Sequence, residues 1–180
     1  MKKTTARLII TEDCPRNCDL CCNKQHKATI DAARHVSYDL EGLEKYDAVV
    51  ITGGEPCLYP DLLTMVVERL KHQLMVREVY LYTSIFSSVL KEHLGVDLDG
   101  VTYSLHYPIT NGDVGMFRHM GHLVADRQSA SCRLWVDQRI TWDNPFVAGE
   151  GWKRVTIAPM LRDCPTLHHE ELYVLEGGHR

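Results

Sequence analysis

The sequence has no long apolar run and no excess of one charge. None of its segments approaches the roughly 20 consecutive apolar residues that a membrane-spanning helix needs, so we expect no membrane partner. The formal net charge of the 180 residues is −4, and both signs are interspersed. A protein that binds nucleic acid usually presents a broad basic surface, so a nucleic-acid partner is not indicated.

We also expect no secretory leader. The apolar residues after the basic start cover only positions 8–10, which is too short for the core of a signal peptide. We therefore expect a cytoplasmic protein, in which thiols stay reduced. The seven cysteines are an odd number, which further disfavours a closed disulfide framework.

Repeats, low-complexity segments and linkers are absent as well. A hydrophobic content of 44% and a charged content of 24% indicate an ordinary globular protein rather than a disordered one. The length suits one domain with a sizeable core. We expect a single domain over residues 1–180, with a frayed tail at about 175–180.

Apolar segments of strand length recur along the chain. Several are continuously apolar, which is typical of strands buried on both faces of a parallel sheet. The six segments are 6–11, 48–52, 76–83, 100–106, 132–140 and 154–159.

Helical patterns separate these segments. Apolar residues at three-and-four spacing predict helices over 62–74, 89–94 and 117–124, and a shorter pattern at Leu40 and Leu43 precedes the second strand. Strands that alternate with helices indicate an α/β fold with a parallel sheet. The pattern leaves open a partial β/α barrel or an open doubly wound sheet, and both place ligands at the carboxyl ends of the strands.

Three cysteines follow the first predicted strand directly. Cys14, Cys18 and Cys21 form a C-x3-C-x2-C motif, and thiolates favour zinc, copper(I) or iron–sulfur clusters. A structural zinc site normally uses two pairs of ligands, and no second C-x2-C pair follows, because the later cysteines are isolated: Cys57, Cys132 and Cys164. We therefore favour an iron–sulfur site. Three ligands for four irons leave one iron open for chemistry.

A second motif, G-G-E-P, follows the second predicted strand at residues 53–56. Glycines at the end of a strand allow the backbone to approach a ligand closely. The Glu55 carboxylate can meet an ammonium group. Taken by itself, the same tetrapeptide also fits a glycine-rich turn followed by an acidic residue at a helix start.

Together, the two motifs resemble those of the radical S-adenosylmethionine (radical SAM) superfamily, in the same order and on matching strand ends. The resemblance extends to about Pro159 and implies a minimal single-domain member. It implies a partial (βα)6 barrel, with a parallel sheet and outer helices. It also implies that Cys14, Cys18 and Cys21 hold a [4Fe–4S] cluster whose open iron binds the methionine part of S-adenosyl-L-methionine (SAM).

The resemblance implies further contacts with SAM. The methionine amino group would meet Gly53, Gly54, Glu55 and Pro56, and Leu20 would pack near the adenine. Thr83 and Ser84 would supply the polar end of a strand that contacts the cofactor. Ser104 and His106 would reach the ribose or carboxylate of SAM, and Asp137 would bind a ribose hydroxyl. The backbone of the last strand, at Ala158, would meet the adenine.

The resemblance implies reductive cleavage of SAM to a 5′-deoxyadenosyl radical, which abstracts hydrogen from an unidentified substrate. A small molecule such as a nucleoside, sugar or amino acid is expected, with a one-electron reductant such as flavodoxin or ferredoxin. No catalytic acid or base is assigned, because that depends on the substrate.

Two alternatives remain at this point. The first is an activating enzyme for a larger glycyl radical enzyme, since the motif extends to C-x3-C-x2-C-x-N at Asn23. The second is a metal-binding or electron-transfer module that is not an enzyme and holds a fully ligated metal.

Overall fold

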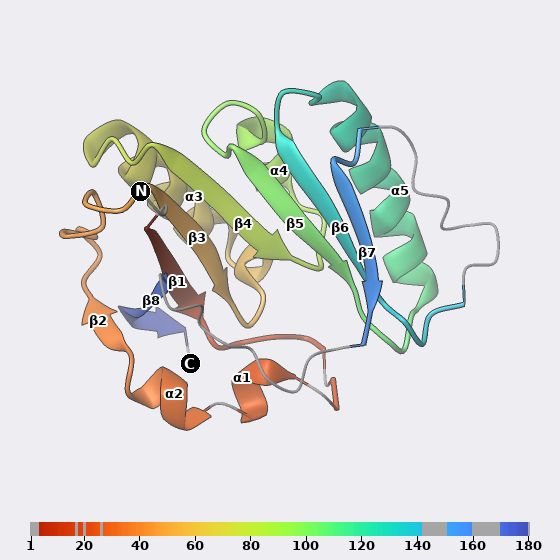
Figure 1. The fold of residues 1–180 in the computed structure, drawn as a ribbon, viewed down its shortest axis with the longest axis horizontal. Helices are drawn as coiled ribbons and strands as arrows, with labels where there is room; N and C mark the ends of the chain where they lie inside the picture. Colours follow the sequence, from red (N-terminus) through yellow and green to blue (C-terminus); the bar gives the residue numbers. More distant parts are fainter. Residues whose placement is uncertain are drawn as a thin grey trace.

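The computed structural model describes residues 4–16, 18, 19, 21–25, 27–141, 151–159 and 170–179. Within this part of the chain, eight strands form one parallel sheet with the order β2-β8-β1-β3-β4-β5-β6-β7 (Figure 1). The strands are β1 (Thr5–Thr11), β2 (Arg34–Val36), β3 (Ala48–Gly53), β4 (Glu78–Thr83), β5 (Gly100–Leu105), β6 (Ser131–Asp137), β7 (Arg154–Ala158) and β8 (Glu170–His179). The expected α/β class and parallel sheet are confirmed.

The helices divide into two groups. The first group packs against the sheet and consists of α3 (Pro60–Glu68), its π-helical continuation η2 (Arg69–Gln73), α4 (Ser88–His93) and α5 (Asn111–Asp126). Two short helices, α1 (Cys22–Gln25) and α2 (Lys27–Asp31), lie near the carboxyl ends of β1 and β3 (Figure 1). A 3-10 turn, η1 (Pro56–Leu58), follows β3. None of the described helices has the length and apolar character needed to cross a membrane.

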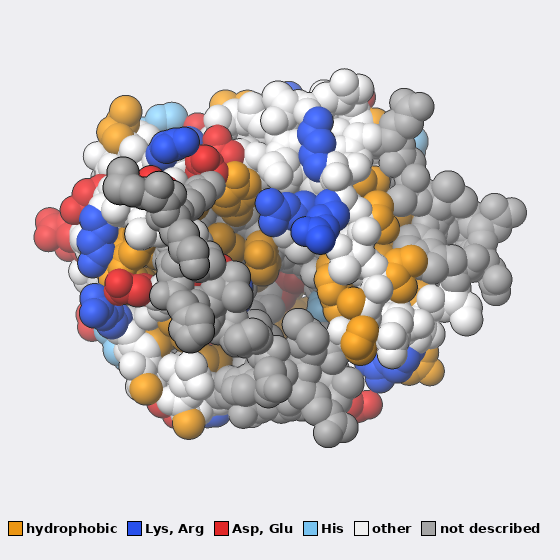
Figure 2. All heavy atoms as spheres, in the orientation of Figure 1, with side chains coloured by type: hydrophobic (Ala, Val, Ile, Leu, Met, Phe, Trp, Pro, Cys, Tyr) orange, Lys and Arg blue, Asp and Glu red, His pale blue; other side chains and the backbone are white. Residues whose placement is uncertain are grey.

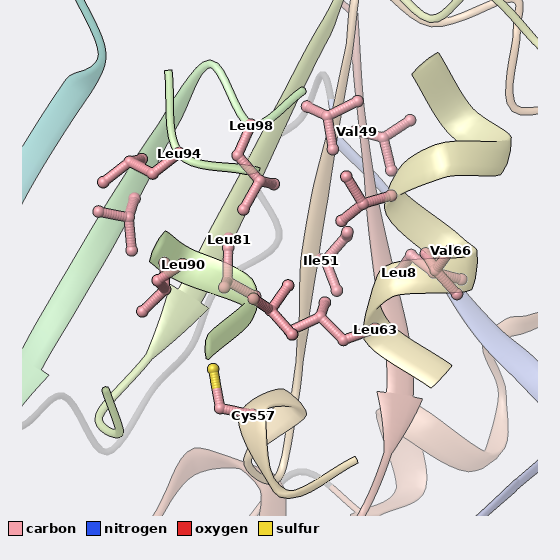
Figure 3. Close-up of a cluster of buried hydrophobic side chains, with 14 of the residues drawn as sticks. Leu8, Val49, Ile51, Cys57, Leu63, Val66, Leu81, Leu90, Leu94 and Leu98 are labelled. Atoms are coloured by element: carbon pink, nitrogen blue, oxygen red, sulfur yellow. The ribbon is translucent and has the colours of Figure 1, made fainter. Parts of the chain in front are cut away.

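One face of the sheet carries the main hydrophobic core. Successive side chains of a strand point to opposite faces, so Leu8, Val49 and Ile51 lie on the same face and meet α3. Figure 3 shows these side chains beside Leu63 and Val66 of α3. Each fully buried aliphatic side chain contributes roughly 1.5–3 kcal/mol to stability. The core therefore occupies one face of the sheet, and only the side chains of the opposite face are available to bind a ligand.

The opposite face is more polar than we expected. In β4, Val79, Leu81 and Thr83 are buried, whereas Tyr80 and Tyr82 of the same strand are partly exposed. The expectation that this segment is buried on both faces is wrong, because the packed helices cover only one of them. The apolar run was misleading because tyrosine has a polar tip on an apolar ring.

Two strands and one turn differ from the sequence-based expectation. All six expected strands are present, but β2 and β8 were not expected. Residues 175–179, expected to fray, instead form the end of β8, where Leu175 pairs with Val36 and His179 with Thr11. The pattern at Leu40 and Leu43 forms turns rather than a helix, although both side chains are fully buried.

Candidate active site

A cavity of about 250 Å³ opens at the carboxyl ends of β1, β3, β4 and β5. Figure 2 shows the hollow on the face of the sheet that α3–α5 leave free. Ten of the expected site residues line the cavity: Cys14, Cys18, Cys21, Gly53, Gly54, Glu55, Thr83, Ser84, Ser104 and His106. They come together because the carboxyl ends of parallel strands meet at one edge of the sheet.

Three of the described residues that were expected at the site do not line the cavity, namely Pro56, Asp137 and Ala158. Leu20 lies outside the described residues, as does Cys164. Pro56 is buried at the start of η1, and Ala158 ends β7, farther along the sheet. Asp137 is fully buried, and its oxygens accept hydrogen bonds from the guanidinium of Arg139 at 3.0 and 2.7 Å. These bonds hold the pKa of Asp137 below its usual value, and they occupy the carboxylate expected to bind a ribose.

The three motif cysteines differ in exposure. Cys14 is exposed, Cys21 is partly buried, and Cys18 is 8% exposed. Desolvation is the main cause that raises the pKa of both Cys14 and Cys18. Among the described residues, no three His, Cys, Asp or Glu side chains are placed to hold one metal ion together. The thiols thus border a common cavity without converging on a single point.

The two glycines of the second motif allow the two loops to meet. A Cβ atom on Gly53 would lie 2.2 Å from the carbonyl oxygen of Thr11, and one on Gly54 would lie 2.1 Å from that of Asp13. The Gly54 N–H donates to Thr11 O and the Glu55 N–H to Asp13 O, both at 2.7 Å. We expected these glycines to admit a ligand; in the structure, they admit the backbone that leads into Cys14.

Glu55 is held by four hydrogen bonds beneath the cavity and is 2% exposed. Its Oε1 accepts from Thr83 Oγ1 at 2.6 Å and from the Cys57 N–H at 3.1 Å. Its Oε2 accepts from the N–H and the hydroxyl of Ser84, both at 2.8 Å. The end of β4 therefore fixes the orientation of this carboxylate before any ligand binds.

Sequence reasoning did not predict the contacts by which Arg16 and Asn23 position the cysteine loop. Arg16, between the first two cysteines, donates to Ser84 Oγ at 3.2 Å and pairs with the buried carboxylate of Asp113. Asp113 also forms the capping box of α5 with Thr110. Asn23 Nδ2 donates to Gly53 O at 2.6 Å. Arg16 could have been singled out as a charged residue within the C-x3-C segment. Its partner Asp113 could not, because 97 positions separate the two residues in the sequence.

The imidazole ring of His106 lines the cavity. Its Nδ1 is buried and finds no hydrogen-bond partner within the described part of the chain. Its ring lies against Trp135, with ring centroids 6.1 Å apart. Burial, followed by the positive charge of Arg16, lowers the pKa of His106 to about 4. The ring is therefore neutral at physiological pH and can donate or accept one hydrogen bond from a ligand.

This depressed pKa predicts that the protein loses stability in mild acid. Between the ordinary His value of 6.5 and the folded value of about 4, the unfolded chain binds the proton and the folded protein does not. The free energy of unfolding should therefore be about 2 kcal/mol lower at pH 5 than at pH 7 because of His106. Urea unfolding of the cofactor-free protein at both pH values measures it.

The matched variants for this measurement are His106→Gln and His35→Gln. The first should show about 2 kcal/mol less pH dependence between pH 7 and pH 5 than the wild type. The second removes an exposed imidazole on β2 and should keep the wild-type dependence. Equal pH dependence in the wild type and His106→Gln would contradict the assignment.

Comparison with known proteins assigns no family. No protein-family model matches the chain, and no curated protein matches its sequence. The functional interpretation therefore depends on the two motifs and on the cavity they share.

Proposed function

We propose that this protein is a radical SAM enzyme. The observation that carries the proposal is the meeting of two motifs at one cavity. The C-x3-C-x2-C loop follows β1, the G-G-E-P segment follows β3, and β1 and β3 are neighbours in the sheet. Either motif has a simple structural explanation when taken separately, whereas their joint placement at a ligand edge matches the resemblance noted in the sequence.

The donor set suits a [4Fe–4S] cluster. Cys14, Cys18 and Cys21 would supply three soft thiolates, each to a different iron, so they need not converge on one ion. SAM would complete the site beside Gly54 and Glu55. When bound, the two groups supply one-electron cleavage of SAM and abstraction of a hydrogen atom from the substrate.

The residues of this chain would bind and orient the cofactor. The buried Glu55 carboxylate offers negative charge to the ammonium group of the methionine part, and Thr83 and Ser84 hold it in place. The Ser104 hydroxyl on β5 and the neutral His106 ring directly after β5 would offer hydrogen bonds to SAM. Arg16 keeps the cysteine loop in contact with the end of β4.

The sheet supports the finer assignment of a partial (βα)6 barrel. Strands β1, β3, β4, β5, β6 and β7 are neighbours in chain order, and the helices α3–α5 contribute to one core on one face. A doubly wound sheet instead has helices packed on both faces, whereas α3–α5 share one core. In this proposal, β2 and β8 extend one edge of the barrel.

The proposed setting is the cytoplasm, with a one-electron reductant such as flavodoxin or ferredoxin. The substrate is a small molecule such as a nucleoside, sugar or amino acid. The cavity of about 250 Å³ is slightly smaller than the usual range for small-molecule sites, but it opens onto the free face of the sheet.

Anaerobic reconstitution with iron and sulfide tests the proposal. We expect the reduced protein to show the EPR signal of a [4Fe–4S] cluster, and addition of SAM to change that signal because SAM binds the open iron. A fully ligated metal module would bind metal and show no response to SAM. A single tetrahedral zinc in protein prepared without oxygen would refute the proposal.

A further inference from the structure

Two arginines on the cavity side of the sheet differ from the other arginines around it. The others each pair with a carboxylate, namely Arg7 with Glu170, Arg16 with Asp113 and Arg139 with Asp137. Arg133 and Arg154 are exposed, and neither forms an ion pair within the described residues. Their charges are therefore available to a ligand.

These two arginines are neighbours across two strands. Arg133 of β6 and Arg154 of β7 are register partners, so they project from the same face of the sheet. Neighbouring strands lie only about 4.8 Å apart, and like charges placed opposite one another repel. In Figure 2, Lys and Arg side chains gather over β5 and β6, beside the hollow. An anion between the two guanidinium groups would remove this repulsion.

The pair lies within reach of the cavity. Arg133 is also the register partner of Thr102 on β5, and Ser104, which lines the cavity, is two residues farther along that strand. One strand spacing across and two residues along place the Cα atoms of Arg133 and Ser104 roughly 8 Å apart. A small molecule held by the arginines can therefore extend into the cavity.

We propose that Arg133 and Arg154 bind the phosphate group of a phosphorylated small-molecule substrate whose reacting part lies in the cavity. The planar guanidinium fork matches phosphate oxygens in pairs. A phosphate monoester carries a charge close to −2 at neutral pH and balances both arginines, whereas a carboxylate balances only one. The word substrate rests on the proposed function, but the anion site itself does not.

Binding of inorganic phosphate to the cofactor-free protein, followed by ³¹P NMR, tests the site. Arg133→Gln and Arg154→Gln should each weaken binding about tenfold, because each removes a charge-assisted pair of hydrogen bonds. Lys153→Gln is the matched control, since it removes an exposed charge next to Arg154 on the opposite face and should leave binding within about twofold. Circular dichroism should show that all three variants remain folded, because the altered side chains are exposed.

Three results would overturn this inference. They are no phosphate binding by the wild type, unchanged binding in the double variant Arg133→Gln/Arg154→Gln, and equal affinity for acetate and phosphate. The proposed function fails separately: phosphate binding without a response of the cluster to SAM would retain the anion site and refute the radical SAM assignment.

Discussion

Replacement of Cys18 by alanine is expected to abolish binding of an iron–sulfur cluster while the fold survives. The Cys18 thiol is buried beside the cavity, but it does not belong to either hydrophobic core of the sheet. Losing one of three ligands removes an anchor of the cluster, whereas the strands and helices keep their packing. Iron and sulfide analysis after anaerobic reconstitution, together with circular dichroism of the cofactor-free variant, measures both effects.

The matched control for this variant is Cys132→Ala. Cys132 is fully buried on β6, within the main core and away from the cavity. This variant should bind iron like the wild type and should lose about 1 kcal/mol of stability through the small space it leaves. Full iron content in Cys18→Ala, or global unfolding of that variant, would contradict the separation between cluster loop and core.

Gly54→Ala is expected to destabilise the protein by about 3 kcal/mol or more. The added Cβ would lie 2.1 Å from Asp13 O and 2.5 Å from Glu12 O. Both clashing atoms belong to the backbone and cannot move aside like the end of a flexible side chain. The contact between the two motif loops must therefore open, and cluster binding should weaken as well. Urea unfolding and iron analysis measure the two losses.

Gly121→Ala provides the comparison for this glycine. Gly121 lies within α5, and a Cβ there would meet no atom within 4 Å. This substitution should stabilise the protein by about 0.5–1 kcal/mol, because alanine loses less backbone freedom in a helix. An unchanged unfolding midpoint for Gly54→Ala would show that the loops tolerate the added methyl group.

The strands that could be predicted are those whose own segment contains a run of apolar residues. Each of the six expected strands contains enough apolar residues to be recognised from its own segment of the sequence. In contrast, β2 covers only Arg34–Val36, and the end of β8 contains Gly177 and Gly178. Three residues cannot establish a periodicity, and glycines indicate a turn. β2 pairs with β8, and β8 pairs in turn with β1, so both strands depend on residues that are distant in the sequence.

The candidate site was predictable where its residues follow strands directly. Ten expected residues border the cavity because strand ends of a parallel sheet share an edge. The resemblance predicts a ligand contact at Asp137, although Arg139, two residues later in the sequence, already offers this carboxylate a partner. The pairing of Arg16 with Asp113 was not predictable, because it requires the cysteine loop and the start of α5 to be placed in space.

The junction between the two motif loops is made by main-chain atoms on both sides, since the N–H groups of Gly54 and Glu55 meet the carbonyl oxygens of Thr11 and Asp13. On the side of the cysteine loop, such a junction depends on the number of residues between Thr11 and Cys14 more than on their side chains. An insertion of one residue between Thr11 and Cys14 would bring the carbonyl groups out of step with their donors. A chimera in which this loop is exchanged must therefore keep the number of residues between Thr11 and Cys14, which matters more than which residues they are.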